Sequence, residues 1–422
     1  MAKKILIIDD SALMRRIFCD IIKADNRFEV TDIAKDGVEG IALLANKSYD
    51  AVILDINMPK MNGIEVLQEI RRQHINVTVV VASTYTKDGE ATLKCLELGA
   101  VDFIQKPLIT RDTKTDTFRN LFMSIIEAAA SINTTGSSNL ASPVNLTDKA
   151  KQASRAKKPS VGVAADDKRS KLFIKKSLDK ALDTKSVSMA DLSRGVKTDS
   201  KSEPKTDSKI DSKLDTKLDS KKNARGKGGK LVAICTSTGG PQALKAVIPL
   251  IPANIGVPVL VVQHMPSGFT KSLAERLNDI SKITVCEAEQ DQELKKNCVY
   301  IARGGNHLKI KEENGVRRII YTDEPPREGV KPCANYMYES LIDTSFDDIT
   351  CVVLTGMGKD GCEGIKNLVS ACPDKKVFVI AQSKETSTVY GMPRAVDLAG
   401  LTNESVDISQ VTNEIIMNVG VK

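Results

Sequence analysis

A long polar stretch divides the chain into two regions, and in each region short apolar segments alternate with helical patterns. In the first region the apolar segments are KILIID, FEVTDIA, YDAVILDI, VTVVVAST and VDFIQKP. In the second they are LVAIC, VPVLVVQ, KITVCEA, CVYIA, TCVVLTG and KVFVIAQ, together with the hairpin-like LKIKEENGVRRIIYT. Strands that alternate with helices form parallel sheets that helices cover. The sequence therefore predicts two doubly wound α/β domains, the first flavodoxin-like and the second Rossmann-like.

We place the first domain at residues 1–126, a low-complexity linker at 127–229 and the second domain at 230–422. A chain of 422 residues is too long for one hydrophobic core. Residues 131–229 contain a single aromatic residue, Phe173, and offer too little apolar surface to offset the entropy lost on folding. We therefore expect a disordered linker.

Part of this linker repeats every four residues, and the repeat argues against a helix. Asp residues from Asp207 to Asp219 alternate with Lys residues from Lys209 to Lys221, so a helix would stack like charges four residues apart. A solvated coil is expected there. Elsewhere in the linker, the segment Leu172–Leu182 has an amphipathic pattern that allows one or two helical turns to dock onto another surface, with an idle disordered segment as the favoured alternative.

The distribution of charge argues against a nucleic-acid partner. The chain carries a formal charge of +7, but residues 131–229 hold 23 Lys and Arg against 12 Asp and Glu, which leaves the remaining residues at −4. No apolar run is long enough to span a bilayer and no signal peptide is evident, so we expect a cytoplasmic protein without membrane insertion. Nine scattered cysteines without a CxxC pair predict reduced thiols, mostly buried.

Three acidic residues end strands of the first domain. Asp9 and Asp10 end the first apolar segment and Asp55 ends the third. The carboxyl ends of such strands converge at the crevice where ligands bind. Three carboxylates in one space need a hard divalent cation such as Mg²⁺, with the backbone carbonyl of Asn57 as a further oxygen ligand. Asp55 is then positioned to attack phosphorus, and Lys106 can supply a second positive charge.

These residues, with Ser83 after the fourth strand and Pro107 after Lys106, resemble the two-component receiver family. The resemblance implies that Asp10 and Asp55 hold Mg²⁺, with Asp9 acting indirectly, and that Asp55 accepts phosphate from a histidine kinase. It also implies that Ser83 and Lys106 relay the event. Phe103 stands where the family often has a switching aromatic, and an ordinary core position is the alternative for it.

Ser237, His264 and Asp360 each follow an apolar strand of the second domain. Ser237 lies at a strand-to-helix turn after LVAIC, His264 follows VPVLVVQ, and Asp360 follows CVVLTG. A serine nucleophile needs an adjacent base, and that base needs an orienting carboxylate. Because the three strand ends meet at one sheet edge, the sequence predicts a Ser-His-Asp set.

The segments STGGPQAL, QHMP, LTGMGKDG and VYGMPRAV resemble the catalytic domain of chemotaxis-specific protein-glutamate methylesterases. The resemblance implies that Ser237 is the nucleophile, His264 the general acid/base, Asp360 the orienting acid and the Met357 amide an oxyanion donor, with Thr238 beside the nucleophile. The implied substrates are methyl esters of methyl-accepting chemoreceptors, with deamidation of receptor glutamines as a second activity. It implies no cofactor in this domain and an intramolecular contact through which the unphosphorylated receiver shields the cleft.

Several alternatives stay open on the sequence alone. Ser237 can simply cap its helix, Asp360 can be a turn residue, and His307 can be a hydrogen-bonded structural histidine. A nucleophilic Cys235 is disfavoured, because it ends an apolar strand, and His74 is expected at the surface. A catalytically inactive adaptor is the rival function, whereas a DNA-binding regulator would need a helix-turn-helix that the sequence lacks.

Two segments depart from the methylesterase pattern. Cys235 and Thr236 stand where the family usually has small residues before its serine, and 332–336 (PCANY) stands where it generally has a segment like Pro-Ser-Val-Asp-Val. The first departure is expected to be tolerated by the fold, whereas the second can change substrate preference or turnover. The linker is also longer than usual, which predicts looser autoinhibition.

Overall fold

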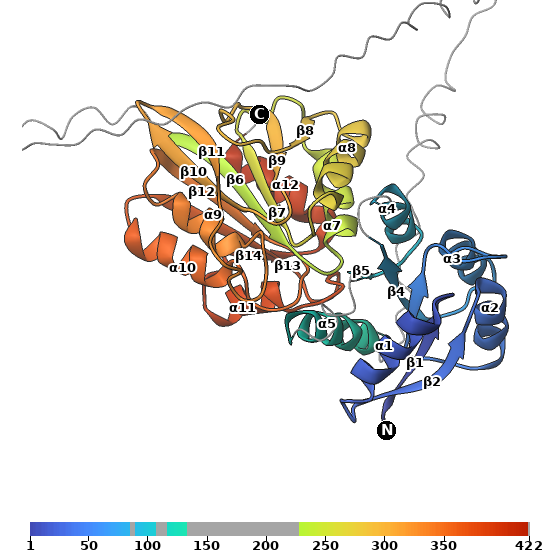
Figure 1. The fold of residues 1–422 in the computed structure, drawn as a ribbon. Helices are drawn as coiled ribbons and strands as arrows, with labels where there is room; N and C mark the ends of the chain where they lie inside the picture. Colours follow the sequence, from blue (N-terminus) through green and yellow to red (C-terminus); the bar gives the residue numbers. More distant parts are fainter. Residues whose placement is uncertain (85–88, 107–115, 133–227, 421–422) are drawn as a thin grey trace, which may run out of the picture. The chain divides into compact units, whose positions relative to one another are not determined.

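The computed structural model describes residues 1–84, 89–106, 116–132 and 228–420 (Figure 1). The predicted linker, including its repeat and the segment 172–182, falls almost entirely outside the described residues, as does Pro107.

The first domain is a five-stranded parallel sheet in the order β2-β1-β3-β4-β5. Its strands are β1 (Lys3–Ile8), β2 (Phe28–Ala34), β3 (Ala51–Asp55), β4 (Thr78–Ser83) and β5 (Asp102–Gln105). Its helices are α1 (Ala12–Ile22), α2 (Gly37–Asn46), α3 (Gly63–Arg72), α4 (Gly89–Glu97) and α5 (Asp116–Ile132). Side-chain alternation gives this sheet two buried faces, because Ile5 and Ile7 pack with α1 and α5 whereas Leu6 and Ile8 pack on the other side.

The second domain is a seven-stranded parallel sheet in the order β14-β13-β12-β6-β7-β9-β8. Its strands are β6 (Gly229–Thr236), β7 (Val259–Gln263), β8 (Thr284–Glu287), β9 (Cys298–Ile301), β12 (Phe346–Val353), β13 (Lys376–Gln382) and β14 (Glu404–Val406). The expectation of two parallel α/β sheets is confirmed.

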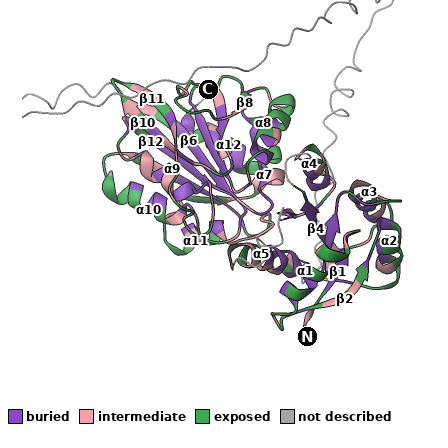
Figure 2. Cartoon of the chain, viewed as in Figure 1, coloured by how far each residue is buried: buried purple, intermediate pink, exposed green. Residues whose placement is uncertain are grey.

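Helices cover both faces of this second sheet, and the burial colours of Figure 2 show its strands largely buried. The helical elements are α7 (Gly240–Val247), η2 (Ile248–Leu250), α8 (Phe269–Ile280), α9 (Ala334–Ser340), α10 (Cys362–Ala371), α11 (Met392–Leu398) and α12 (Ile408–Val419). On one face Val232 and Ile234 pack in the core that includes α7, α8 and α12 residues. On the other face Leu231 and Ala233 pack with α9, α10 and α11.

The predicted hairpin is present as the antiparallel pair β10 (His307–Glu313) and β11 (Val316–Thr322). Asn314 and Gly315 connect the strands with positive φ angles of 51° and 79°, a conformation that matches the twist of a tight hairpin. Leu308, Ile310 and Ile319 bury the hairpin against the α9 side of the second domain.

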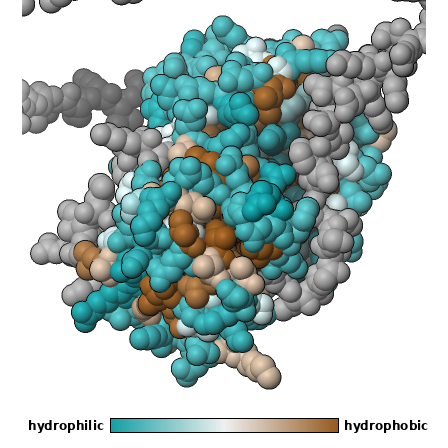
Figure 3. All heavy atoms as spheres, turned by 90° about the vertical axis from the view of Figure 1, so that its right-hand side faces the viewer, coloured by the Kyte–Doolittle hydropathy of each residue, from teal (hydrophilic) through white to brown (hydrophobic). Residues whose placement is uncertain are grey.

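The face of the molecule drawn in Figure 3 is mainly polar. Figure 3 shows a largely hydrophilic face on which apolar residues gather near the middle. No helix in the described parts of the chain is long and apolar enough to cross a membrane.

Replacing Phe18 by Ala should destabilise the first domain by about 3–5 kcal/mol, because it empties a fully buried site. The Phe18 ring stacks on that of Phe122 with a centroid distance of 5.1 Å, so both rings lose contacts. Urea unfolding of the full chain measures the effect. Leu13→Ala, at a position on the same helix that is 54% exposed, is the control and should cost about 0.5 kcal/mol or less. Equal losses in the two variants would contradict the assigned core.

Candidate functional site

The three acidic residues of the first domain lie together at the carboxyl ends of β1 and β3. One oxygen atom from each of Asp9, Asp10 and Asp55 lies within 4.8 Å of the others. Asp9 and Asp55 are buried, whereas Asp10 is exposed and gives the cluster access to solvent. The Asn57 amide donates to Asp55 Oδ1 at 3.4 Å. Three carboxylates of this kind fit a hard cation with oxygen ligands.

Lys106 bridges the two buried carboxylates of this cluster. Its Nζ lies 2.8 Å from Asp9 Oδ2 and 2.8 Å from Asp55 Oδ2. Burial nevertheless raises the pKa of Asp55 to about 6, against the lowering effect of Lys106, and Asp9 adds like-charge repulsion. One lysine therefore leaves the cluster short of positive charge.

The two other predicted relay residues are also buried. Ser83 ends β4, and its hydroxyl accepts a hydrogen bond from Thr92 Oγ1 at 2.9 Å. Phe103 on β5 is 6% exposed and lies in the hydrophobic core.

Ser237 and His264 follow paired residues of neighbouring strands. Thr236 of β6 is in register with Gln263 of β7, so the next residue of each chain segment emerges at the same sheet edge. The Gln263 side-chain amide donates to the carbonyl oxygens of Ser237 at 3.0 Å and His264 at 3.2 Å. The Ser237 amide donates to Thr355, just beyond β12, at 3.0 Å. These bonds fix the backbone on both sides of the serine.

His264 and Asp360 are in direct contact. His264 Nε2 lies 2.7 Å from Asp360 Oδ2, and the aspartate is 3% exposed. Burial alone would raise the pKa of Asp360, but the hydrogen bond from His264 and the backbone amides around the carboxylate lower it to about 2. His264 Nδ1 is buried and has no hydrogen-bond partner among the described residues. That nitrogen is therefore available to a neighbouring hydroxyl.

Two glycines allow the backbone to close around Ser237. A Cβ on Gly356 would lie 2.3 Å from Met392 Sδ and 2.8 Å from Ser237 Cβ. A Cβ on Gly240 would lie 1.9 Å from Gln263 Oε1. All three distances are shorter than non-bonded atoms tolerate, so both glycines allow close packing in the motifs that contain them.

The other two predicted site residues are Thr238, which follows Ser237 in the chain, and Met357, whose loop packs against Ser237. Met357 follows Gly356, whose position against Ser237 brings this loop to the strand edge. Thr238 is buried, and its Oγ1 donates to Asp102 Oδ2 of β5 at 2.6 Å. Burial raises the pKa of Asp102 to about 6. Sequence reasoning missed Asp102, because no local pattern shows which residue of another domain meets Thr238.

The remaining histidines and Cys235 are not members of the predicted Ser-His-Asp set. His307 is fully buried and makes two hydrogen bonds, as the structural alternative required. His74 is exposed, as predicted. Cys235 is fully buried, and burial raises the pKa of its thiol well above the usual value. A protonated, enclosed thiol is a poor nucleophile.

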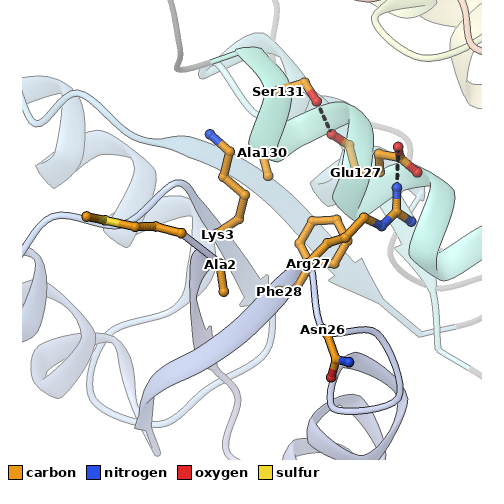
Figure 4. Close-up of a pocket in the computed structure, with 9 residues that line it drawn as sticks. Ala2, Lys3, Asn26, Arg27, Phe28, Glu127, Ala130 and Ser131 are labelled. Carbon is orange, nitrogen blue, oxygen red and sulfur yellow. Dashed lines mark hydrogen bonds and ion pairs between the residues drawn. The ribbon is translucent and has the colours of Figure 1, made fainter.

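A pocket of about 480 Å³ lies at the amino end of the first sheet, away from both clusters. Figure 4 shows the Arg27–Glu127 ion pair, 2.7 Å long, beside Lys3 and Phe28. The pocket lies at the amino ends of β1 and β2. The predicted site residues lie at the opposite, carboxyl ends of the strands, so the pocket is not part of either candidate site.

The native chain should protect Cys235 from alkylation at neutral pH, because its thiol is buried and protonated. Cys372, which is half-buried, should react faster and serves as the internal reference. Mass spectrometry of peptides after timed exposure to iodoacetamide measures both rates. Labelling of Cys235 at the rate of Cys372 would revive the thiol-nucleophile alternative.

Comparison with known proteins gives matches along both domains. Residues 232–415 match the family described as CheB methylesterase, and residues 5–116 match the response regulator receiver domain. A protein-glutamate methylesterase/protein-glutamine glutaminase 1 of Syntrophomonas wolfei is 34% identical over 420 residues, which are 98% of each chain. A protein-glutamate methylesterase/protein-glutamine glutaminase of Geobacillus kaustophilus is 33% identical over 99% of each chain.

Among solved structures, the catalytic domain of the Thermotoga maritima CheB methylesterase is 38% identical. It covers 45% of this chain and 98% of its own length, with a TM-score of 0.43.

Proposed function

This chain belongs to the family of protein-glutamate methylesterases/protein-glutamine glutaminases, and we propose that it hydrolyses glutamate methyl esters of chemoreceptors under the control of phosphorylation at Asp55. Deamidation of receptor glutamines is the second proposed activity, because the relatives are also named as protein-glutamine glutaminases. The observation that carries the catalytic proposal is the His264–Asp360 contact beside Ser237, with one imidazole nitrogen left without a partner.

In the proposed mechanism, His264 Nδ1 accepts the Ser237 proton as the hydroxyl attacks the ester carbonyl. Asp360 Oδ2 accepts a hydrogen bond from Nε2–H, stays ionised and stabilises the imidazolium that forms. The Met357 amide donates to the oxyanion of the tetrahedral intermediate. Methanol then leaves with the proton from Nδ1, and a water molecule activated by the same nitrogen releases the receptor carboxylate and restores Ser237. For a glutamine substrate the leaving group is ammonia.

The electrostatics of the pair suit this role. A carboxylate whose pKa is about 2 stays ionised at neutral pH and holds the imidazole in the tautomer with its proton on Nε2. Nδ1 then carries the lone pair that a general base needs. A catalytically inactive adaptor would have no need of a buried charge held in this way, so we favour the enzyme.

For the receiver we propose that Asp10, Asp55 and the Asn57 carbonyl hold Mg²⁺, with Asp9 supporting them. When bound, the ion supplies the positive charge that lets Asp55 accept a phosphoryl group from a histidine kinase. The clustered carboxylates and the raised pKa of Asp55 support this proposal. The proposed relay residues are Ser83, which ends the neighbouring strand β4, and Lys106, which follows β5 and contacts Asp55.

The proposed control acts through direct contacts of the receiver with the catalytic domain. Besides the Asp102–Thr238 hydrogen bond, Arg276 donates to Glu97 Oε1 at 2.9 Å, and the Phe103 and Phe269 rings lie 4.7 Å apart. The receiver residues of these contacts lie on α4 and β5, which adjoin Ser83 and Lys106. We propose that phosphorylation moves this surface and opens access to Ser237.

Ser237→Ala should lower ester hydrolysis by about 10³-fold or more, because the acyl acceptor is removed. Methanol release from methylated receptor membranes measures the rate. Ser405→Ala, the same change at an exposed position on β14, is the control and should keep the wild-type rate. Equal rates in wild type and Ser237→Ala would refute the enzyme proposal.

Asp55→Asn should abolish activation by a small-molecule phosphodonor, because no phosphoryl acceptor remains. Wild type should release methanol faster when acetyl phosphate and Mg²⁺ are added, whereas the variant should keep its basal rate. Asp20→Asn, at an exposed residue of α1, is the matched control and should respond as wild type does. A full response from Asp55→Asn would overturn the regulatory assignment.

A further inference from the structure

We propose that Cys333 is a positioning residue for the triad: its thiol donates a hydrogen bond to Asp360, while His307 holds the Cys333 backbone in place. The inference rests on the proposed function, because it concerns how the orienting acid of the same site is held. It also gives a role to the segment 332–336, whose sequence departs from the family pattern.

Five donors surround the Asp360 carboxylate. Oδ2 accepts from His264 Nε2 at 2.7 Å and from the Ala334 amide at 2.6 Å. Oδ1 accepts from Cys333 Sγ at 2.9 Å, from the Asn335 amide at 3.0 Å and from the Gly361 amide at 2.9 Å. His264 and Cys333 are the two side chains in this set, and they bond to different oxygens. Together they fix the rotation of the carboxylate about its own axis.

The Cys333 thiol is suited to donate rather than to ionise. It is fully buried, and both burial and the neighbouring charge of Asp360 raise its pKa. A protonated thiol has one hydrogen, and the carboxylate can only accept. The Sγ–Oδ1 contact of 2.9 Å is therefore an S–H···O bond to a charged acceptor.

His307 fixes the backbone of Cys333 through a hydrogen bond. His307 Nδ1 accepts from the Cys333 amide at 3.2 Å, and Nε2 lies 3.2 Å from the Pro325 carbonyl oxygen. Because a carbonyl oxygen only accepts, the proton belongs on Nε2 and the lone pair on Nδ1. Burial lowers the pKa of His307, which keeps the imidazole neutral and Nδ1 able to accept.

The segment is also tied to the helix that follows Asp360. Asn335 Oδ1 accepts from the Gly361 amide at 3.0 Å and from the Gly364 amide at 2.7 Å. A Cβ on Gly364 would lie 2.6 Å from Asn335 Cα, so α9 and α10 meet without a gap. Backbone groups thus set the position of Asp360, and the Cys333 thiol sets which way its oxygens face.

Kinetics of the full-length enzyme separate positioning from packing. Cys333→Ala should lower kcat by about 10-fold with little change in KM, because misplacement of the acid impairs proton transfer after substrate is bound. Cys333→Ser keeps a donor and should stay within about 3-fold of wild type. Cys351→Ala is the control for an emptied site, because this buried thiol lies in the same core but is not a donor to Asp360. It should keep the wild-type kcat.

Two spectroscopic measurements do not depend on turnover. The infrared difference spectrum of wild type minus Cys333→Ser isolates the S–H stretch of Cys333, which should lie at lower frequency than that of Cys351 from wild type minus Cys351→Ala. The low-field proton resonance of His264 Nε2–H should shift in Cys333→Ala and return toward its wild-type position in Cys333→Ser. The infrared comparison tests the proposal even where Cys333→Ala fails to fold, because it needs only the serine variant and the control.

The proposal is overturned if the two S–H stretches coincide, or if Cys333→Ala matches Cys351→Ala in both kcat and the His264 resonance. A wild-type protein without esterase activity that still shows the shifted S–H stretch would refute the proposed function and leave the positioning role standing.

Discussion

The parallel arrangement of the strands is the constraint from which both sites follow. In a parallel sheet every strand ends at the same edge, so residues distant in sequence meet there without any special folding device. Asp9 and Asp55 lie together at the ends of β1 and β3, and Ser237 and His264 each follow one of a pair of residues in register at the ends of β6 and β7. The same geometry crowds charged groups into buried space, and each domain must compensate for that charge.

The two domains compensate in different ways. In the first domain Lys106 is the one lysine that pairs with the two buried carboxylates of Asp9 and Asp55, and the pKa of Asp55 is raised to about 6. At Asp360 an imidazole, three backbone amides and a thiol serve one carboxylate, and its pKa falls to about 2. The first site lacks positive charge and suits a bound cation. The second is complete without one and suits an acid that must stay ionised.

Sequence patterns predicted where the strands end, because a strand end depends on the order of neighbouring residues in the chain. The placement of Asp360 beside His264, and the hairpin turn at Asn314, both follow from an apolar segment and the residues that end it. Side-chain contacts between residues far apart in the sequence were not predictable in this way. Nothing local pairs Asp102 with Thr238, and nothing in the sequence shows which nitrogen of His264 faces the aspartate. Such features depend on side-chain directions that only the packed structure fixes.

Two residues in the segments that depart from the family pattern make hydrogen bonds around the predicted Ser-His-Asp set. Thr236, which replaces a small residue, donates through Oγ1 to the Thr355 carbonyl at 2.8 Å and so ties the end of β6 to the segment after β12. The same oxygen would lie 2.6 Å from a Cβ on Gly240, so Thr236 adds to the crowding that Gln263 Oε1 already imposes at this glycine. Cys333 acts likewise on Asp360. Thr236 and Cys333 each supply a side-chain donor beside a predicted site residue.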